Sequence, residues 1–309
     1  MIGPAALTAG ALQVAGIALA PLLPGTVQSF KARLQGRAGP SPLQPYRELR
    51  RLWSKSVVRP SDAGVLYLMA PAVAASAAAA CLVIVPVAGE SLRWPLGDDA
   101  LVLVGLLALA RFAVTAAAWD TGSGFALMGA ARDLMIAVFL EGVLALVIVL
   151  AALPAAGTDL GRMSAAASGS GIWGNPSHWC ALIAFALVAV CETGRQPVDN
   201  PDTHLELTMI HEGPLLEYAG RDLAYLQWAA GARHWLMLLL AAGLFLPHGG
   251  SFWLRLLELA ITAPLFAAAL ALNETWQAKM RLMRVPRFLG AGALVALLGL
   301  AGWMLGAGT

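Results

Sequence analysis

Long apolar runs separated by short polar segments dominate the pattern of this sequence. A helix needs about 20 apolar residues to cross about 30 Å of hydrocarbon. Two runs are weak, because one has a core of only 13 apolar residues at 179–191 and the next begins with Arg233 and His234. The pattern predicts an all-α integral membrane protein, one polytopic domain over residues 1–309 with about eight transmembrane helices, at 3–29, 62–88, 99–119, 133–154, 173–192, 232–247, 252–273 and 287–306.

Basic residues lie almost entirely in every second loop between these runs. The opposite loops hold three Lys and Arg residues, whereas 16 lie in the loops at 30–61, 120–132, 193–233 and 274–287. Cytoplasmic loops of membrane proteins carry an excess of Lys and Arg. We therefore expect these four loops in the cytoplasm and both termini on the outer side of the membrane.

The composition agrees with lipid as the solvent. Hydrophobic residues make up 59% of the chain and charged residues 12%, against about 25% charged in a typical soluble domain. No basic residue precedes the first apolar run, which argues for a first helix that stays rather than a cleaved signal peptide. The three cysteines form no CxxC and are expected to be small buried hydrophobic residues, so this chain should hold no iron–sulfur cluster or haem.

The first cytoplasmic loop leads from an irregular stretch into a short basic helix. Glycine and proline residues interrupt 36–45, and residues 46–55 then place Leu49, Leu52 and Trp53 on one side. This pattern is typical of an interfacial helix on anionic lipid and also of a docking surface for another subunit, and the two interpretations are compatible. The candidate docking residues in this loop are Arg37, Arg47, Arg50 and Arg51.

The loop at 193–233 is acidic, with six Asp and Glu residues. Acidic residues contribute little to topology, so we expect another role for them. The candidates for a polar pathway are Asp199, Glu206 and Glu212, and the candidates for partner docking are Arg195, His204, His211 and Glu217.

The two histidines of that loop do not predict a metal site. His204 and His211 are seven residues apart, which matches no standard zinc motif. A polar network, or a proton donor near the membrane surface, is the better interpretation. The chain also has no GxxxxGK(S/T), HExxH or GxSxG, and we expect no ATPase or hydrolase site.

Glu141 stands within the fourth run, where neither span nor orientation needs a charge. It lies eight residues beyond Asp133, which is about 12 Å deeper along a helix. An unpaired carboxylate at such depth costs about 2.5–3.5 kcal/mol. We interpret Glu141 as a proton-relay carboxylate that faces a hydrated interior. The alternative is a protonated Glu that hydrogen-bonds a neighbouring helix.

Other charged residues are candidates to complete that relay. Arg111, in the third run, is expected to pair with this carboxylate or with Asp120, and a purely structural ion pair stays open. Glu192 ends the fifth run, and its spacing to Arg195 allows an i, i+3 contact at the helix end. With Asp133 and the acidic loop, these residues would form a polar entrance to the relay.

The run 192–212, ETGRQPVDNPDTHLELTMIHE, closely resembles one family. It is similar to the membrane subunit of group 4 membrane-bound nickel–iron hydrogenases, which include formate hydrogenlyase and hydrogenase-4. That subunit is homologous to subunit 1, the H subunit, of respiratory complex I. The match continues through 216–220 and returns in the first loop at 35–46, and a looser one covers 122–132.

The resemblance implies a bundle like that of complex I subunit 1, with cytoplasmic loops that dock the hydrogenase large and small subunits. The small subunit would carry iron–sulfur clusters and the large one the nickel–iron centre, with no cofactor in this chain. Family carboxylates that match Glu141, Glu192 and Glu206 line a polar path linking redox chemistry to ion movement. The expected surroundings are antiporter-like membrane subunits and the lipid of a prokaryotic inner membrane, with no nucleic acid.

One departure separates two branches of this family. The complex I version has a more acidic loop, with Pro-Phe-Asp followed by closely spaced Glu residues, whereas residues 197–204 here read PVDNPDTH. This difference favours the hydrogenase branch over a quinone-binding subunit, which stays the alternative. A standalone transporter is a third hypothesis, and no clear inverted repeat supports it.

Overall fold

Apolar runs of the predicted kind form helices in the computed structural model, which describes residues 4–91, 97–169, 171–200, 208–247 and 249–307. Within those ranges there is no β-strand, and the only bridges are two isolated ones. The α-helices are α1 (Pro4–Leu19), α2 (Leu22–Leu34), α3 (Gln44–Trp53), α4 (Val65–Ile84), α5 (Ala100–Asp120), α6 (Gly124–Ala152), α7 (Leu160–Ala167), α8 (Pro176–Glu192), α9 (Gly220–Phe245), α10 (Phe252–Trp276) and α11 (Val285–Gly302). Three short 3-10 helices lie between them: η1 (Ile172–Gly174) before α8, η2 (Gly213–Leu215) before α9 and η3 (Leu282–Arg284) before α11.

The predicted membrane helices correspond to helices of the structure. Six are individually long and apolar enough to cross a membrane: α4, α5, α6, α9, α10 and α11 with its flanking turns. The bent pair α1 and α2 makes a seventh, and α8 is a shorter apolar helix of 17 residues at the place of the weak fifth run. The prediction of an all-α membrane bundle is therefore confirmed.

Two helices begin earlier than the apolar pattern predicts. Helix α6 begins at Gly124 rather than at 133, and α9 begins at Gly220 rather than at 232. The apolar pattern detects only the part of a helix that lies in hydrocarbon, so polar turns that extend the helix are read as loop. The first turns of α9 thus lie in the segment that we predicted as the loop 193–233. That loop is therefore shorter than expected.

The first membrane crossing is broken near Pro21, where α1 and α2 meet at 55°. Proline has no N–H to donate to the carbonyl four residues earlier, here that of Ile17. The Trp228 indole of α9 donates to this carbonyl at 2.9 Å, and the Tyr46 hydroxyl of α3 donates to the carbonyl of Ala18 at 2.6 Å. Both α3 and α9 therefore hold the break in place.

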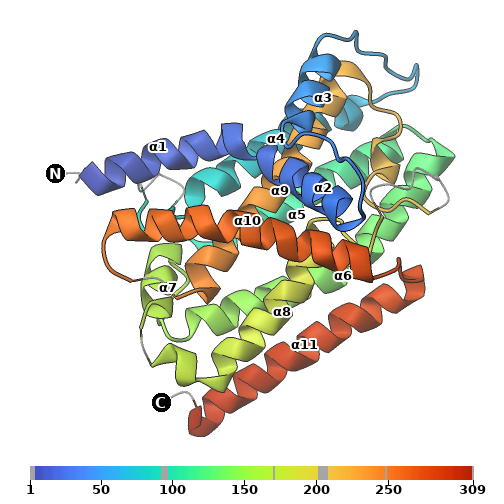
Figure 1. Ribbon diagram of the computed structural model, residues 1–309. Coiled ribbons are helices and arrows are strands. Elements are labelled where there is room, and N and C mark those ends of the chain that lie inside the picture. Colours follow the sequence, from blue (N-terminus) through green and yellow to red (C-terminus); the bar gives the residue numbers. More distant parts are fainter. Residues whose placement is uncertain (1–3, 92–96, 170, 201–207, 248, 308–309) are drawn as a thin grey trace.

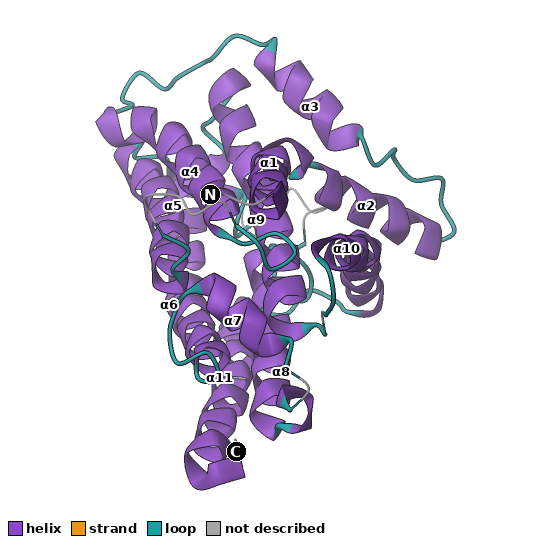
Figure 2. Ribbon diagram, turned by 90° about the vertical axis from the view of Figure 1, so that its left-hand side faces the viewer, coloured by secondary structure: helices purple, strands orange, loops and turns teal. Residues whose placement is uncertain are grey.

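The helices pack as a bundle around α9. Helix α4 packs against α5 and α9, α2 packs against α10, and α11 packs against α6 and α8. Figure 2 shows α4 and α5 on one flank and α2 and α10 on the other, with α9 between them. In Figure 1 both termini lie at the left, and α3 lies at the upper right.

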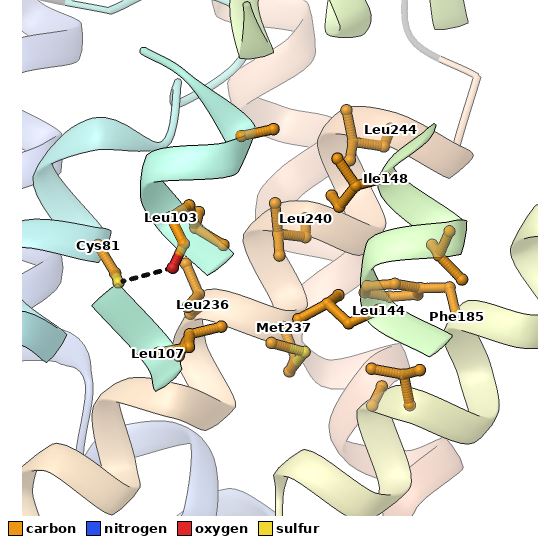
Figure 3. Packing of buried hydrophobic residues seen from close by; sticks show 14 of the residues in the cluster. Cys81, Leu103, Leu107, Leu144, Ile148, Phe185, Leu236, Met237, Leu240 and Leu244 are labelled. Atoms are coloured by element: carbon orange, nitrogen blue, oxygen red, sulfur yellow. Dashed lines mark hydrogen bonds between the residues drawn. The ribbon is translucent and has the colours of Figure 1, made fainter. Parts of the chain in front are cut away.

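An apolar core joins α5, α6, α8 and α9. Leu144, Ile148, Phe185 and Leu240 are each at most 2% exposed and interlock in Figure 3. The Cys81 sulfur of α4 lies on the other side of the cluster drawn in Figure 3, 3.9 Å from the carbonyl oxygen of Leu103. Burial of this apolar surface stabilises the bundle.

Candidate functional site

A buried ion pair lies where α5 passes the end of α8. The Arg111 guanidinium of α5 donates to the Glu192 carboxylate at 2.5 Å, and the two side chains are 5% and 3% exposed. Leaving one such charge without its partner costs several kcal/mol, because neither ion is solvated by water. Arg111 does not pair with Asp120, whose carboxylate instead accepts the backbone N–H of Tyr67 at 2.9 Å.

This pair is the middle of a longer row of alternating charges. On one side, Arg111 lies 3.8 Å from the Glu141 carboxylate of α6. On the other side, Glu192 lies 3.9 Å from the Arg233 guanidinium of α9. The four residues, which we call the central charge chain, come from four different helices and balance two carboxylates with two guanidinium groups. The expected pairing of Glu141 with Arg111 is therefore present, at a longer distance than the pairing with Glu192.

A second set of charges ties the loop after α8 to α6 and to the segment after α10. His211 lies 3.2 Å from Asp199 through one ring nitrogen and 3.7 Å from Asp133 through the other. The Lys279 ammonium donates to Asp199 at 2.7 Å. Burial acts to raise the pKa of Asp199, but hydrogen bonds and charge from His211 and Lys279 outweigh it and hold that pKa well below its usual range. We call these four residues the loop charge group.

A third set joins α2, α10 and the start of the loop. The Glu274 carboxylate is fully buried, and it contacts the Lys31 ammonium at 3.1 Å and the Arg195 guanidinium at 2.9 Å. Arg195 also donates through Nε to His234 at 3.1 Å, and the other ring nitrogen of His234 faces the carbonyl of Ala230 at 2.9 Å. A ring that accepts at one nitrogen and donates at the other is neutral. This set, the α10 cluster, therefore holds His234 in one tautomer.

A cavity of about 640 Å³ lies between these charges and the break in the first crossing. Its walls are the α1–α2 break, α3, the loop after α8 and the first turns of α9. Members of all three charged sets face it, together with residues from the break and from α3, and they include Pro21, Gln44, Glu192, Arg195, His211 and Arg233. The cavity therefore gives water or a ligand direct access to the charged interior.

Several candidate site residues lie at the edge of the buried site or outside it. Glu212 lines the cavity, and the backbone oxygen of Glu217 accepts the Tyr67 hydroxyl at 2.7 Å. The basic side chains of the first loop project from α3 and the turn before it, where Arg51 pairs with Glu48 and Arg37 contacts Gln35; these side chains are Arg37, Arg47, Arg50 and Arg51. His204 and Glu206 lie outside the described residues.

The expected contact between Glu192 and Arg195 is replaced by longer-range pairs. Helix α8 ends at Glu192, and Gly194 then adopts a left-handed conformation with φ of +62°. Arg195 is thus no longer on the helix, and the i, i+3 rule for helical neighbours does not apply to it. The turn sends Arg195 towards Glu274 and brings Gly194 against the His211 ring, where a Cβ would lie 3.4 Å from the ring atoms.

Five residues of the three charged sets were not among the candidates: Lys31, Arg233, His234, Glu274 and Lys279. Lys31, Glu274 and Lys279 lie just beyond the ends of predicted membrane runs, where a charge looks routine. Glu274 had one usable signal, because it is the one acidic residue in a loop segment, 274–287, with four basic residues. Nothing in a single sequence says that its partners come from positions 31 and 195.

The site offers no arrangement suited to a metal ion in the part of the chain that the structure describes. Those residues contain no group of three or more His, Cys, Asp or Glu side chains close enough to hold one. Cys81, Cys180 and Cys191 are unpaired thiols.

The profile of a family described as NADH dehydrogenase matches residues 7–304. Formate hydrogenlyase subunit 4 of Escherichia coli (strain K12) is 31% identical over 291 residues, which cover 89% of this chain and 91% of that protein. Hydrogenase-4 component C of the same strain is 33% identical over 232 residues, covering 75% of this chain and 72% of that protein. A chain of the membrane-bound sulfane sulfur reductase, an archaeal respiratory membrane complex, has the same fold, with a TM-score of 0.79 at 20% identity over 95% of this chain and 97% of that one.

Proposed function

Because this chain belongs to the NADH dehydrogenase family, as its match over residues 7–304 shows, we propose that it carries the ion pathway of an energy-converting nickel–iron hydrogenase. It is a multi-pass membrane subunit of a complex I-like complex, and the family resemblance read from its loops is confirmed. In this proposal it anchors the hydrogenase subunits to the membrane and couples their electron transfer to proton or ion movement.

The central charge chain is the observation that carries the proposal. Arg111 stands between two carboxylates, at 2.5 Å from Glu192 and at 3.8 Å from Glu141. A guanidinium stabilises the ionised form of whichever carboxyl it contacts. When Glu192 takes up a proton from the cavity, Arg111 shifts towards Glu141 and favours loss of a proton there. One arginine thereby links proton binding at the cavity to proton release inside the membrane.

The direction of this pathway is lateral. On each of the four helices, a well-buried apolar residue lies within two turns of the charge; these residues are Leu107, Leu144, Phe185 and Leu236. The Glu141 side chain, in contrast, is 34% exposed on the surface of α6. A carboxylate exposed at membrane depth is costly in lipid, so Glu141 faces a polar group of a neighbouring membrane subunit, such as an antiporter-like one.

The cavity end of the chain is the docking side for the peripheral subunits. Helix α3 lines the cavity through residues such as Gln44 and Glu48, opposite Asp199 and His211 of the loop charge group, and its basic side chains Arg47, Arg50 and Arg51 are exposed. In the proposal, the hydrogenase small subunit with its iron–sulfur clusters and the large subunit with the nickel–iron centre bind here. The charge at their redox centres then changes the proton affinity of the cavity wall. The excess of Lys and Arg in these loops supports a cytoplasmic location for this side and an outer location for both termini.

A quinone site is the second candidate function, and the cavity is what favours it. A volume of about 640 Å³ is within the range of sites for small molecules, and the break between α1 and α2 forms one wall. If quinone binds, short-chain quinone analogues inhibit electron transfer by the purified complex in competition with added quinone. Hydrogen formation that such analogues leave unchanged supports the hydrogenase assignment.

The assignment to a hydrogenase is tested by isolating the complex. The chain is tagged at its C-terminus, extracted in a mild detergent and purified with whatever subunits remain bound. We expect nickel and iron in the preparation and hydrogen evolution with a low-potential electron donor. A stable preparation that contains iron but no nickel, and that reduces quinone instead, would contradict the hydrogenase assignment.

A further inference from the structure

His211 lies between two carboxylates from distant parts of the fold. One ring nitrogen, Nδ1, lies 3.2 Å from Oδ2 of Asp199 in the loop, and the other, Nε2, lies 3.7 Å from Oδ1 of Asp133 on α6. The first distance is that of a hydrogen bond and the second is slightly too long for one. Neither Nε2 nor Oδ1 of Asp133 has a hydrogen-bond partner among the described residues, although both atoms are buried.

The positions of the protons explain this difference. Asp199 accepts the backbone N–H groups of Ile210 at 3.3 Å and His211 at 3.1 Å, and it accepts the Lys279 ammonium at 2.7 Å. An ionised carboxylate with such partners only accepts, so Nδ1 of His211 is the donor. In the neutral ring, Nε2 is then unprotonated and can only accept a hydrogen bond. It faces Oδ1 of Asp133, which is also an acceptor, so no hydrogen bond forms between the two atoms.

The loop segment 208–216 already lies against α6 on both sides of this contact. Gly129 of α6 and Gly213 pack so closely that a Cβ on Gly129 would lie 2.6 Å from the Cα of Gly213. The Arg132 guanidinium donates to the carbonyl of Met209 at 3.0 Å. A small movement of the His211 ring is therefore enough to close its contact with Asp133.

We infer that the His211–Asp133 contact is a proton-operated latch, which binds the loop segment 208–216 to α6 when one proton is taken up and releases it when the proton leaves. The proton comes from cavity water and binds Nε2 of His211. The resulting imidazolium donates Nε2–H to Asp133 and keeps its Nδ1–H on Asp199, and release reverses these steps. The inference rests on the proposed function, because it names where the charge state of the cavity acts on the helix that carries Glu141.

Charged groups from every neighbouring element set the pH at which the latch closes. Carboxylates near the ring favour the bound proton and cations oppose it. Helix α6 contributes Arg132 and Asp133, α5 contributes Arg111, the loop contributes Asp199 and Glu212, α9 contributes Arg233 and His234, and the segment after α10 contributes Lys279. Histidine is the side chain that ordinarily exchanges its proton between pH 5 and 8, so the test compares pH values within that range.

Hydrogen exchange of the purified complex at pH 6 and pH 8 tests the latch directly. After correction for the intrinsic rates, we expect amides of the segment 208–216 to exchange about tenfold more slowly at pH 6 than at pH 8, which corresponds to about 1.4 kcal/mol. In His211→Gln the side chain no longer titrates, so its exchange should not depend on pH. Wild-type exchange that is the same at both pH values would overturn the inference.

Two further variants keep the test informative. Asp133→Asn places an amide donor opposite Nε2, and we expect the segment to be protected at both pH values. Glu141→Gln lies outside the latch, so it should keep the pH-dependent exchange while losing ion coupling. If Glu141→Gln loses coupling but wild-type exchange does not depend on pH, the latch is wrong and the proposed function stands. If the latch is present but the Glu141→Gln complex still pumps, the ion-pathway proposal is wrong.

Discussion

The charged region around the cavity and the apolar core beside it share the same four helices but follow opposite physical rules. Arg111, Glu192 and Arg233 hold charge inside the bundle through pairwise contacts from different helices. One or two helical turns away from these charges, Leu144 and Phe185 are 1% and 2% exposed. They belong to the apolar core, in which Figure 3 draws one hydrogen bond, that of Cys81. The first region borders the cavity, and the second fills the bundle beyond it.

In the proposed ion pathway, this difference defines the route of a proton. Charged side chains are tolerated inside the bundle because each contacts a group of opposite charge. The row of charges stops where the apolar core begins. In that proposal, a proton that enters from the cavity leaves laterally at Glu141 rather than along the helices. The predictions below alter one region at a time and ask whether stability and ion coupling respond separately.

The largest effect is expected from Arg111→Met. The substitution leaves the buried Glu192 carboxylate with the more distant Arg233 as its remaining cation. Loss of one partner of a buried pair costs about 3–5 kcal/mol. We expect a large drop in the thermal stability and membrane abundance of the complex. The double variant Arg111→Met/Glu192→Leu should recover most of that stability while ion coupling stays lost, and a stable single variant would contradict the pairing.

Leu240→Ala tests the apolar core. The side chain is 1% exposed, and truncating a buried leucine costs about 2–5 kcal/mol. Leu240→Met keeps the volume and should cost less than about 1.5 kcal/mol. We expect both variants, in the fraction that assembles, to move as many protons per electron as the wild type. A reduced ratio in either one would show that the core takes part in conduction.

Asp199 predicts how stability depends on pH. Its pKa is lowered in the folded state, so the stabilisation is present above the ordinary value near 3.8 and is lost as the pH falls through and below it. Asp199→Asn removes hydrogen bonds to a charged group, at about 1.5–3 kcal/mol near neutral pH, and should flatten the acid branch of a melting-temperature profile. The exposed Asp62→Asn is the control, and an equal change in both variants would contradict the assignment.

The smallest effect concerns the broken first crossing. Trp228→Phe removes the donor to the Ile17 carbonyl, and Tyr46→Phe removes the donor to that of Ala18. Each change should cost about 1 kcal/mol and loosen the wall of the cavity. Trp253→Phe serves as a matched control, because that side chain is 66% exposed and should change stability by less than about 0.5 kcal/mol. Equal melting temperatures for all three variants would refute the role of these donors.

Much of the fold was accessible from local pattern alone. Apolar runs predict the helices because lipid makes length and polarity decisive, and the weak run at 173–192 is indeed the short helix α8. The basic helix after the first loop was also recognisable, since α3 occupies Gln44–Trp53. Glu141 and Arg111 stood out because a charge within an apolar run has a high cost and so needs a reason.

The pairing of the charges was not accessible in the same way. Lys31 pairs with Glu274, near the other end of the chain. Lys279, in the segment after α10, pairs with Asp199 in the loop after α8. Such pairs depend on which helices become neighbours, and one sequence contains no information on contact between distant positions. Local rules also failed where a single turn redirected the backbone, as Gly194 does for Arg195.

The ratio of protons moved to electrons transferred in Glu141→Gln is the most direct test of a lateral ion pathway. The complex is reconstituted in proteoliposomes, with Glu258→Gln as the control because that carboxylate lies on α10 away from the central charge chain. We expect Glu141→Gln to keep electron transfer and lose proton movement, and Glu258→Gln to keep both. An unchanged ratio in Glu141→Gln would contradict the account.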